Sequence, residues 1–138
     1  MSKEQIAALE HAFIVATTTD EVMALMDDDH VRYDDVAPLQ MTGPADPRAS
    51  FDQFFDDCRE PRGHFMSLQV EVEADDRIGV AHSLMHFTWR DATGTPAEAA
   101  FRVTHCLRKK GDHWKIYHSH VSFPINPATG MAEMNLNA

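Results

Sequence analysis

Two histidines, His118 and His120, lie two residues apart near the end of the chain, in a segment that alternates apolar and polar residues. Alternate side chains of a β-strand point to the same face, so this alternation predicts that both imidazoles share a face with Trp114 and Ser122. Histidine titrates near neutral pH and can act as base, acid or hydrogen-bond donor. We interpret the pair as acid–base groups that face an apolar cavity. The alternative is two structural histidines, each bonded to an internal partner.

The strand predicted just before this segment carries Arg102 and Thr104 on one face. If that face is concave, the Arg102 guanidinium can bind a substrate carboxylate or pair with an acid such as Asp35. A structural Arg–Asp pair is an equally good interpretation, because a buried arginine needs a partner. Asp35 is itself a candidate base or a group that orients a histidine, and the alternative is a carboxylate that caps the following turn.

The chain has nine histidines, which raises the question of a metal site. His82 and His86 share one face of a predicted strand, and a His-x-His pair such as 118 and 120 can bind zinc or copper. Because no third ligand stands at a fixed spacing, we predict no metal site. The remaining histidines are predicted at the surface or in turns: His11, His30, His64, His105 and His113.

Three helices are predicted in the first part of the chain. The first has apolar residues at helical spacing after a capping box of Ser2 and Gln5. The second begins at a cap, Asp20, and ends in the acidic run before His30, where clustered aspartates are expected to be solvated. The third begins with Asp46 as its cap and carries a stripe of phenylalanines.

Strands dominate the rest of the chain. A short strand is predicted over 31–36, with Tyr33 and Asp35 on one face. Pro61 and Gly63 are expected to end the third helix. Four long strands then follow at 64–74, 78–91, 97–109 and 113–123.

Helices followed by long antiparallel strands are typical of the α+β class. A coiled sheet that wraps a helix leaves a blind cavity at its open end, which is a small-molecule site by default. Several apolar side chains are expected to pack in the core or line this cavity: Met23, Met26, Phe51, Phe54 and Phe55.

Composition narrows the class of protein. With 138 residues the chain suits one domain, 1–138. Its net charge of −10 argues against binding to nucleic acid or to an anionic membrane. Cys58 and Cys106 show no CxxC spacing and are expected to be free thiols. The N-terminus lacks the apolar run of a signal peptide, so a cytoplasmic location is predicted.

The C-terminal block, RVTHCLRKKGDHW continuing into WKIYHSHVSFP, resembles the end of SnoaL-like, ketosteroid isomerase-related proteins. In that family an Arg-x-Thr strand is followed by a Gly-bearing turn, a Trp and a His-x-His-x-Ser-x-Pro ending. The segments VAHSL and YDDVAPL, the latter followed by Gly43, are also similar to the family. The resemblance covers about 20–124.

This resemblance implies a cone-like α+β barrel of the nuclear transport factor 2-like superfamily, with a curved, mostly antiparallel sheet around N-terminal helices. It also implies a homodimer joined through sheet faces, and it places Tyr33 and Asp35 at the cavity mouth. Members include isomerases, dehydratases, epoxide hydrolases, polyketide cyclases and proteins with no known reaction. The Asp base and oxyanion-hole residues of ketosteroid isomerases proper have no matching positions, so steroid isomerisation is not predicted.

We therefore expect a cofactor-independent isomerase, dehydratase or cyclase that acts on a small, apolar carbonyl compound. His118, His120 and Asp35 are the predicted catalytic residues. The predicted ligand-binding residues are Tyr33, His86, Arg102, Thr104, Trp114 and Ser122, with Tyr33 or Arg102 polarising an oxygen.

A non-catalytic ligand-binding domain is the alternative, with histidines that are structural or sense pH. In either case the outer sheet face would form a homodimer through Tyr117, Val121 and Phe123.

Overall fold

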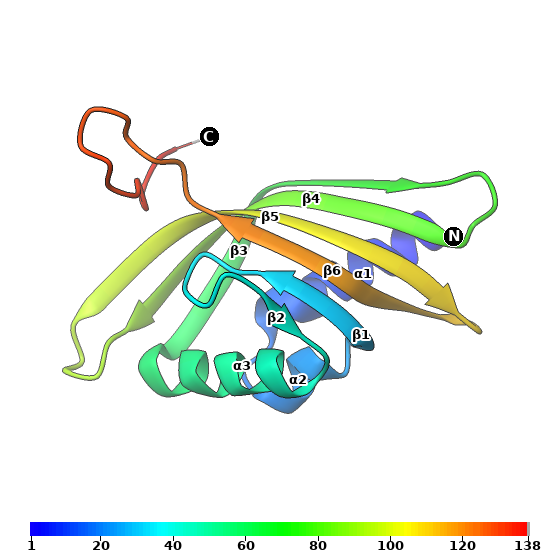
Figure 1. Ribbon diagram of the computed structural model, residues 1–138, viewed down its shortest axis with the longest axis horizontal. Coiled ribbons are helices and arrows are strands. Elements are labelled where there is room, and N and C mark those ends of the chain that lie inside the picture. The colour runs from blue at the N-terminus through cyan, green and yellow to red at the C-terminus, as the bar shows by residue number, and fades with distance from the viewer. Residues whose placement is uncertain (138) are drawn as a thin grey trace.

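The computed structural model describes residues 1–137, and its main element is a curved six-stranded sheet (Figure 1). The strands are β1 (Met26–Tyr33), β2 (Met41–Thr42), β3 (Arg59–Val72), β4 (Ile78–Arg90), β5 (Pro96–Lys110) and β6 (His113–Ser122). They lie in the order β2-β1-β6-β5-β4-β3, and all neighbours are antiparallel except β1 and β6, which run parallel. The predicted α+β class with a mostly antiparallel sheet is confirmed.

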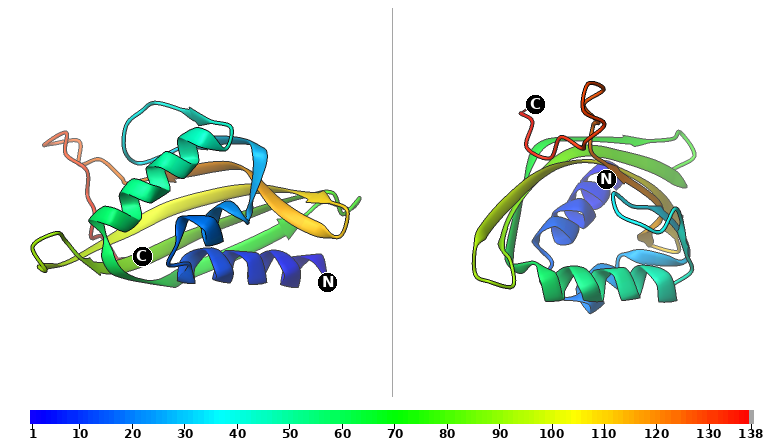
Figure 2. Two further views of the ribbon diagram at one scale, coloured as in Figure 1. Left: turned by 90° about the horizontal axis from the view of Figure 1, so that it is seen from below. Right: turned by 60° about the vertical axis from the view of Figure 1, so that its left-hand side comes forward.

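Three helices cover the concave face of the sheet (Figure 2). α1 (Ser2–Val15) lies along the inner face, α2 (Thr19–Met23) leads into β1, and α3 (Ala45–Asp57) spans the open side of the arch. The sheet does not close on itself, so the cone is an arch completed by helices. No helix within residues 1–137 has the length and apolar character needed to cross a membrane.

The narrow half of the cone is a packed core. Ile6 and Leu9 of α1 belong to one buried cluster with Leu107 of β5 and Ile116 of β6. The helix approaches β4 closely at Gly79, where a Cβ atom would lie 2.6 Å from Cδ1 of Ile6. Burying one large apolar side chain of this cluster contributes about 1.5–3 kcal/mol to the stability of the fold, so the cluster holds α1 on the sheet.

The acidic run before His30 is the start of β1 and not the solvated end of a helix. Asp27 is fully buried there, and its carboxylate accepts hydrogen bonds from Arg108 Nε at 2.8 Å and Lys110 Nζ at 2.9 Å. The two bonds come from β5, and they supply the compensation that a buried carboxylate requires. Asp27 therefore ties the first strand to the centre of the sheet.

Two histidines predicted at the surface or in turns are fully buried, so those predictions are wrong. His105 lies on the inner face of β5, where its Nδ1 is 2.7 Å from Oε1 of Glu10 on α1. His30 lies on the inner face of β1, where its Nδ1 donates to the carbonyl of Ile116 at 3.0 Å. Each imidazole has a partner across the core, which is what makes burial of a polar ring tolerable.

The helix boundaries differ from the prediction in their details. Thr18, and not Asp20, caps α2, accepting a hydrogen bond from the Glu21 backbone at 3.2 Å. Ser2 lies inside α1 and makes no capping bond. Asp46 also lies inside its helix, and its carboxylate accepts instead from the Thr42 backbone at 3.1 Å.

The four long strands are confirmed, but β3 begins earlier than predicted. α3 ends at Asp57, and both Pro61 and Gly63 are strand residues. Proline is tolerated because β3 is at the edge of the sheet, where a backbone donor can go unused. Glycine is needed because a Cβ at position 63 would lie 2.6 Å from the Phe87 ring.

Candidate functional site

The wide half of the cone encloses a cavity of about 700 Å³ between α3, the inner face of the sheet and the loop after β1. Its walls are mainly apolar and rich in phenylalanine, with Phe13, Phe51, Phe54, Phe87, Phe101 and Phe123 among the lining residues. The phenylalanine stripe of α3 therefore serves the cavity as well as the core. An aromatic, mostly apolar cavity of this size is suited to a small organic molecule.

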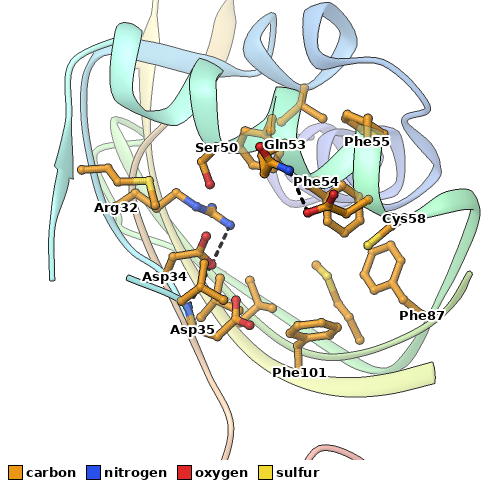
Figure 3. Close-up of a pocket in the computed structure, with 18 of the residues that line it drawn as sticks. Arg32, Asp34, Asp35, Ser50, Gln53, Phe54, Phe55, Cys58, Phe87 and Phe101 are labelled. Atoms are coloured by element: carbon orange, nitrogen blue, oxygen red, sulfur yellow. Dashed lines mark hydrogen bonds and ion pairs between the residues drawn. The ribbon is translucent and has the colours of Figure 1, made fainter. Parts of the chain in front are cut away.

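One end of the cavity is polar, and three residues from the end of β1 and the following loop form it: Arg32, Asp34 and Asp35 (Figure 3). Arg32 Nη2 donates to Asp34 Oδ1 at 3.3 Å, and these side chains are only 6% and 9% exposed. The backbone N–H of Asp35 donates to the same Asp34 oxygen at 2.9 Å. We call these three residues the polar cluster.

The two carboxyls of the polar cluster differ in their pKa values. Burial raises the pKa of Asp35 to about 7, and a hydrogen bond with Asp34 and its negative charge add to the effect. Burial also acts to raise the pKa of Asp34, but the charge of Arg32 and the bonds from Asp35 outweigh it, and the pKa is lowered. As the pH falls below about 7 the pair thus takes up one proton, which lies mainly on Asp35.

Strand alternation positions Arg32. His30 and Arg32 both point to the inner face of β1, and His30 is neutral because burial lowers its pKa to about 4. Its Nε2 accepts a hydrogen bond from the Ser119 hydroxyl at 3.1 Å. The strand is thereby fixed on β6 directly beside the cavity.

Cys58 also lines the cavity, at the end of α3. Burial, with the charges of Asp57 and Asp35, raises the pKa of this thiol to about 11. The group is therefore a neutral thiol at physiological pH and a poor nucleophile. Cys58 and Cys106 are both free, as predicted.

A β-bulge in β6 overturns the central site prediction. His118 pairs with Cys106 and Ile116 pairs with Leu107, so Tyr117 between them has no partner of its own on β5. The extra residue reverses the alternation. Trp114 and Ile116 point inward, and beyond the bulge Ser119 and Val121 do so instead.

His118 and His120 consequently lie on the outer, convex face of the sheet, and the prediction that they face the cavity is wrong. His118 is half-buried, and its Nδ1 donates to the Val31 carbonyl at 2.8 Å. His120 is exposed. The ring of Tyr33 lies edge-on to both imidazoles, with centroids 4.9 Å and 5.7 Å away.

The other predicted ligand contacts also lie away from the cavity. On the convex face, Arg102 Nε donates to Ser122 Oγ at 3.0 Å instead of pairing with Asp35, and His86 Nε2 is 3.1 Å from Glu98 Oε2. Thr104 pairs with His120 on this face. Trp114 points inward, but it packs at the α1 end of the core, where its Nε1 donates to Gln5 at 3.3 Å. Of the nine predicted site residues, Asp35 alone lines the cavity in the described part of the chain.

The same bulge corrects the expected dimer surface. Val121 is buried and Phe123 lines the cavity, so neither belongs to the outer face. Tyr117 is half-buried beneath the guanidinium of Arg108, whose Cζ is 4.7 Å from the ring centroid. The homodimer stays a prediction, and it would have to use other residues.

Arg32 and Asp34 are the site residues that the sequence analysis missed. The signal was present, because positions 30, 32 and 34 share one face of a strand. The apolar Val31 and Tyr33 alternate with these positions, and their pattern favours the opposite face. A C-terminal contribution was also missed: Met134 lines the cavity, and its carbonyl accepts a hydrogen bond from the Ala100 backbone at 2.7 Å.

The folded chain is an α+β cone of the nuclear transport factor 2-like and cystatin-like kind, and solved structures share this fold. A nuclear transport factor 2-like protein of unknown function from Pseudomonas putida KT2440 superposes with a TM-score of 0.86 at 22% identity, over 99% of this chain and 96% of that one. A superfamily member from Salmonella enterica serovar Typhimurium gives 0.81 at 15% identity, over 96% and 97%.

A ketosteroid isomerase-like protein from Erwinia carotovora atroseptica gives a TM-score of 0.73 at 20% identity, over 88% of this chain and 95% of that one. The family model of the SnoaL-like domain matches residues 5–126, so the chain belongs to the SnoaL-like family. Among proteins with curated descriptions, none matches it.

Proposed function

We propose that the protein binds a small, largely apolar carbonyl compound in the cavity and that its carboxyl pair moves a proton to or from the carbon next to the carbonyl. The aromatic walls support the apolar part of this proposal, because they can bury most of such a molecule. The polar cluster at one end supports the proposed proton transfer, because it supplies two carboxyl groups.

The observation that carries the proposal is Asp35, a carboxyl with a pKa raised to about 7 at the edge of an apolar cavity. A general base is most effective when its pKa lies near the working pH. Ionised Asp35 can remove a proton, and protonated Asp35 can return it to another atom of the same molecule. Isomerisation, dehydration and aldol-type cyclisation of carbonyl compounds can each begin with removal of a proton next to the carbonyl, and none of them needs a cofactor.

Deuterium exchange tests this proposal without knowledge of the natural substrate. The probe is 1-tetralone, an aromatic ketone whose protons next to the carbonyl exchange slowly in D₂O. We expect the wild-type protein to accelerate their loss, measured by proton NMR, with a rate that rises through about pH 7 as Asp35 ionises.

Asp35→Asn is expected to reduce the exchange rate to the background of buffer. Asp28→Asn, which removes an exposed carboxylate of β1, is the matched control and should leave the rate unchanged. Binding of 1-tetralone without any acceleration would favour the non-catalytic alternative. Failure of the wild-type protein to bind the ketone at all would contradict the proposed ligand class.

A further inference from the structure

Arg32 has an environment that the proposed proton transfer does not use. Its side chain is 6% exposed, and the distance from its Nη2 to Oδ1 of Asp34 is 3.3 Å, whereas charge-assisted bonds are usually about 2.7–2.9 Å. Nε and Nη1 are buried and have no hydrogen-bond partner among residues 1–137. Burying donors of a cation without partners costs free energy, so the fold tolerates a destabilising arrangement here.

No other side chain or backbone group of residues 1–137 satisfies this guanidinium. On the sheet side Arg32 pairs in register with Ser119, but the Ser119 hydroxyl is bonded to His30. On another side the ring of Phe51 covers Arg32, with Cζ 4.8 Å from the ring centroid. The guanidinium reaches from β1 toward the cavity, in the space between Ser50 and Asp34 (Figure 3). Arg32 lines the cavity, so a molecule bound there is the partner that these donors can gain when the guanidinium turns toward it.

We infer that Arg32 binds the carbonyl oxygen of the ligand and so selects ketones and related acceptors over hydrocarbons of the same shape. The inference rests on the proposed function and adds the group that recognises the oxygen, a role that the sequence analysis gave to Tyr33 or Arg102. A guanidinium only donates hydrogen bonds, so it favours an oxygen that only accepts them.

The same contact assists the proposed reaction. As Asp35 takes the proton, the carbon–hydrogen bond breaks, its electron pair forms a carbon–carbon double bond, and the carbonyl π electrons move onto the oxygen as an enolate. The new negative charge develops beside Arg32, in a largely apolar cavity where a positive charge stabilises it more than water would. Return of the proton from Asp35 to carbon or oxygen reverses the charge separation.

The test compares ¹³C-carbonyl 1-tetralone with tetralin, the hydrocarbon of the same shape, as ligands of the wild-type protein. We expect the ketone to bind at least about tenfold more tightly. We also expect its carbonyl stretching frequency, followed by infrared spectroscopy, to fall on binding because hydrogen bonds from a cation weaken the carbonyl bond.

Arg32→Met on its own would leave Asp34 buried without its cation, so the variant for this test is Arg32→Met combined with Asp34→Asn. This double variant should bind the ketone no more tightly than tetralin, and the carbonyl frequency should not shift on binding. Its affinity for tetralin should stay within about twofold of the wild-type affinity. Arg102→Met on the convex face is the control, and it should keep both the preference for the ketone and the frequency shift.

Equal binding of ketone and hydrocarbon by the wild-type protein, or an unshifted carbonyl frequency, would overturn the role of Arg32 and leave the proposed cavity ligand intact. These wild-type measurements decide the matter even if the double variant does not fold. Binding of neither compound would contradict the proposed function itself, and the inference with it.

Discussion

One aspartate lies at the start of β1 and another just past its end. Both are at least partly buried, and their surroundings shift their pKa values in opposite directions. At the start of the strand, Asp27 accepts bonds from Arg108 and Lys110, and its pKa is lowered to about 2 even though burial opposes this. Just past the end of the strand, Asp35 lies beside a second carboxyl, and burial raises its pKa to about 7. Asp27, whose carboxylate has two cationic partners, and Asp35, whose pKa is close to neutral pH, are thus only eight residues apart.

The difference follows from what each half of the cone supplies. The narrow half is packed, and β5 brings two cations to Asp27. The wide half is hollow, and Arg32 is the cation of the polar cluster, where it faces both Asp34 and Asp35. Groups that stabilise a fold have their partners already, whereas groups that act on a ligand are held at a cost in stability.

The largest expected effect is the loss of stability in Asp27→Asn. The substitution removes the buried charge that Arg108 and Lys110 neutralise, and both cations can still reach water because they are 35% and 54% exposed. We expect the free energy of unfolding to fall by about 2 kcal/mol at pH 7, measured by urea denaturation. Asp28→Asn on the same strand is the control, and an equal loss there would contradict the role of Asp27.

Asp35→Asn should raise the free energy of unfolding, whereas Asp27→Asn lowers it. The pKa of Asp35 is raised on folding, so ionising it costs stability above about pH 7, and that cost disappears below about pH 4, where both folded and unfolded chains are protonated. We expect the variant to be about 1–2 kcal/mol more stable than wild type at pH 8 and equal to it at pH 4. A destabilised variant at pH 8 would show that Asp35 is a structural carboxylate.

The pH dependence of the Asp27 effect sharpens the contrast. The pKa of Asp27 is lowered on folding, so its contribution is complete above about pH 4 and is lost as the pH falls toward 2. The difference between wild type and Asp27→Asn should therefore shrink over this acidic range, whereas the Asp35→Asn difference changes between pH 4 and 7. Unfolding curves across pH 2–8 for both variants check the two windows.

The smallest effect is expected on the convex face. Arg102 is exposed and bonds to Ser122, so Arg102→Ala should change the free energy of unfolding by less than about 0.5 kcal/mol. Exchange of 1-tetralone should continue at the wild-type rate. A loss of exchange in this variant would mean that residues of the convex face take part in the reaction.

Much of the fold was predictable from the sequence because it depends on patterns repeated over many residues. Alternation and helical spacing predict the four long strands and the amphipathic α1 and α3, and the strand ends agree within two residues except at the start of β3, which lies five residues earlier. Buried charges were not predictable in this way. Nothing in the run of aspartates distinguishes Asp27, which meets two cations more than 80 positions away, from Asp28, which is exposed.

The candidate site was predictable only in part, and one local irregularity explains most of the failure. Asp35 was found because a carboxylate next to a turn invites a functional interpretation. His118 and His120 were assigned to the cavity by an alternation that holds up to Ile116 and reverses at Tyr117. A single unpaired residue leaves no signature in composition or spacing, and its effect appears only when the strand is paired with β5.

The unpaired position in β6 also has a consequence for how such proteins diversify. If β6 kept all its residues and paired with β5 without the bulge, every residue beyond Ile116 would move by one register position, and the two imidazoles would replace a serine and a valine on the side of the cavity. Family members with the same His-x-His letters can therefore present different side chains to the cavity according to whether the strand forms this bulge. Comparing their strand registers at this position, more than comparing their motifs, would sort them by what they do.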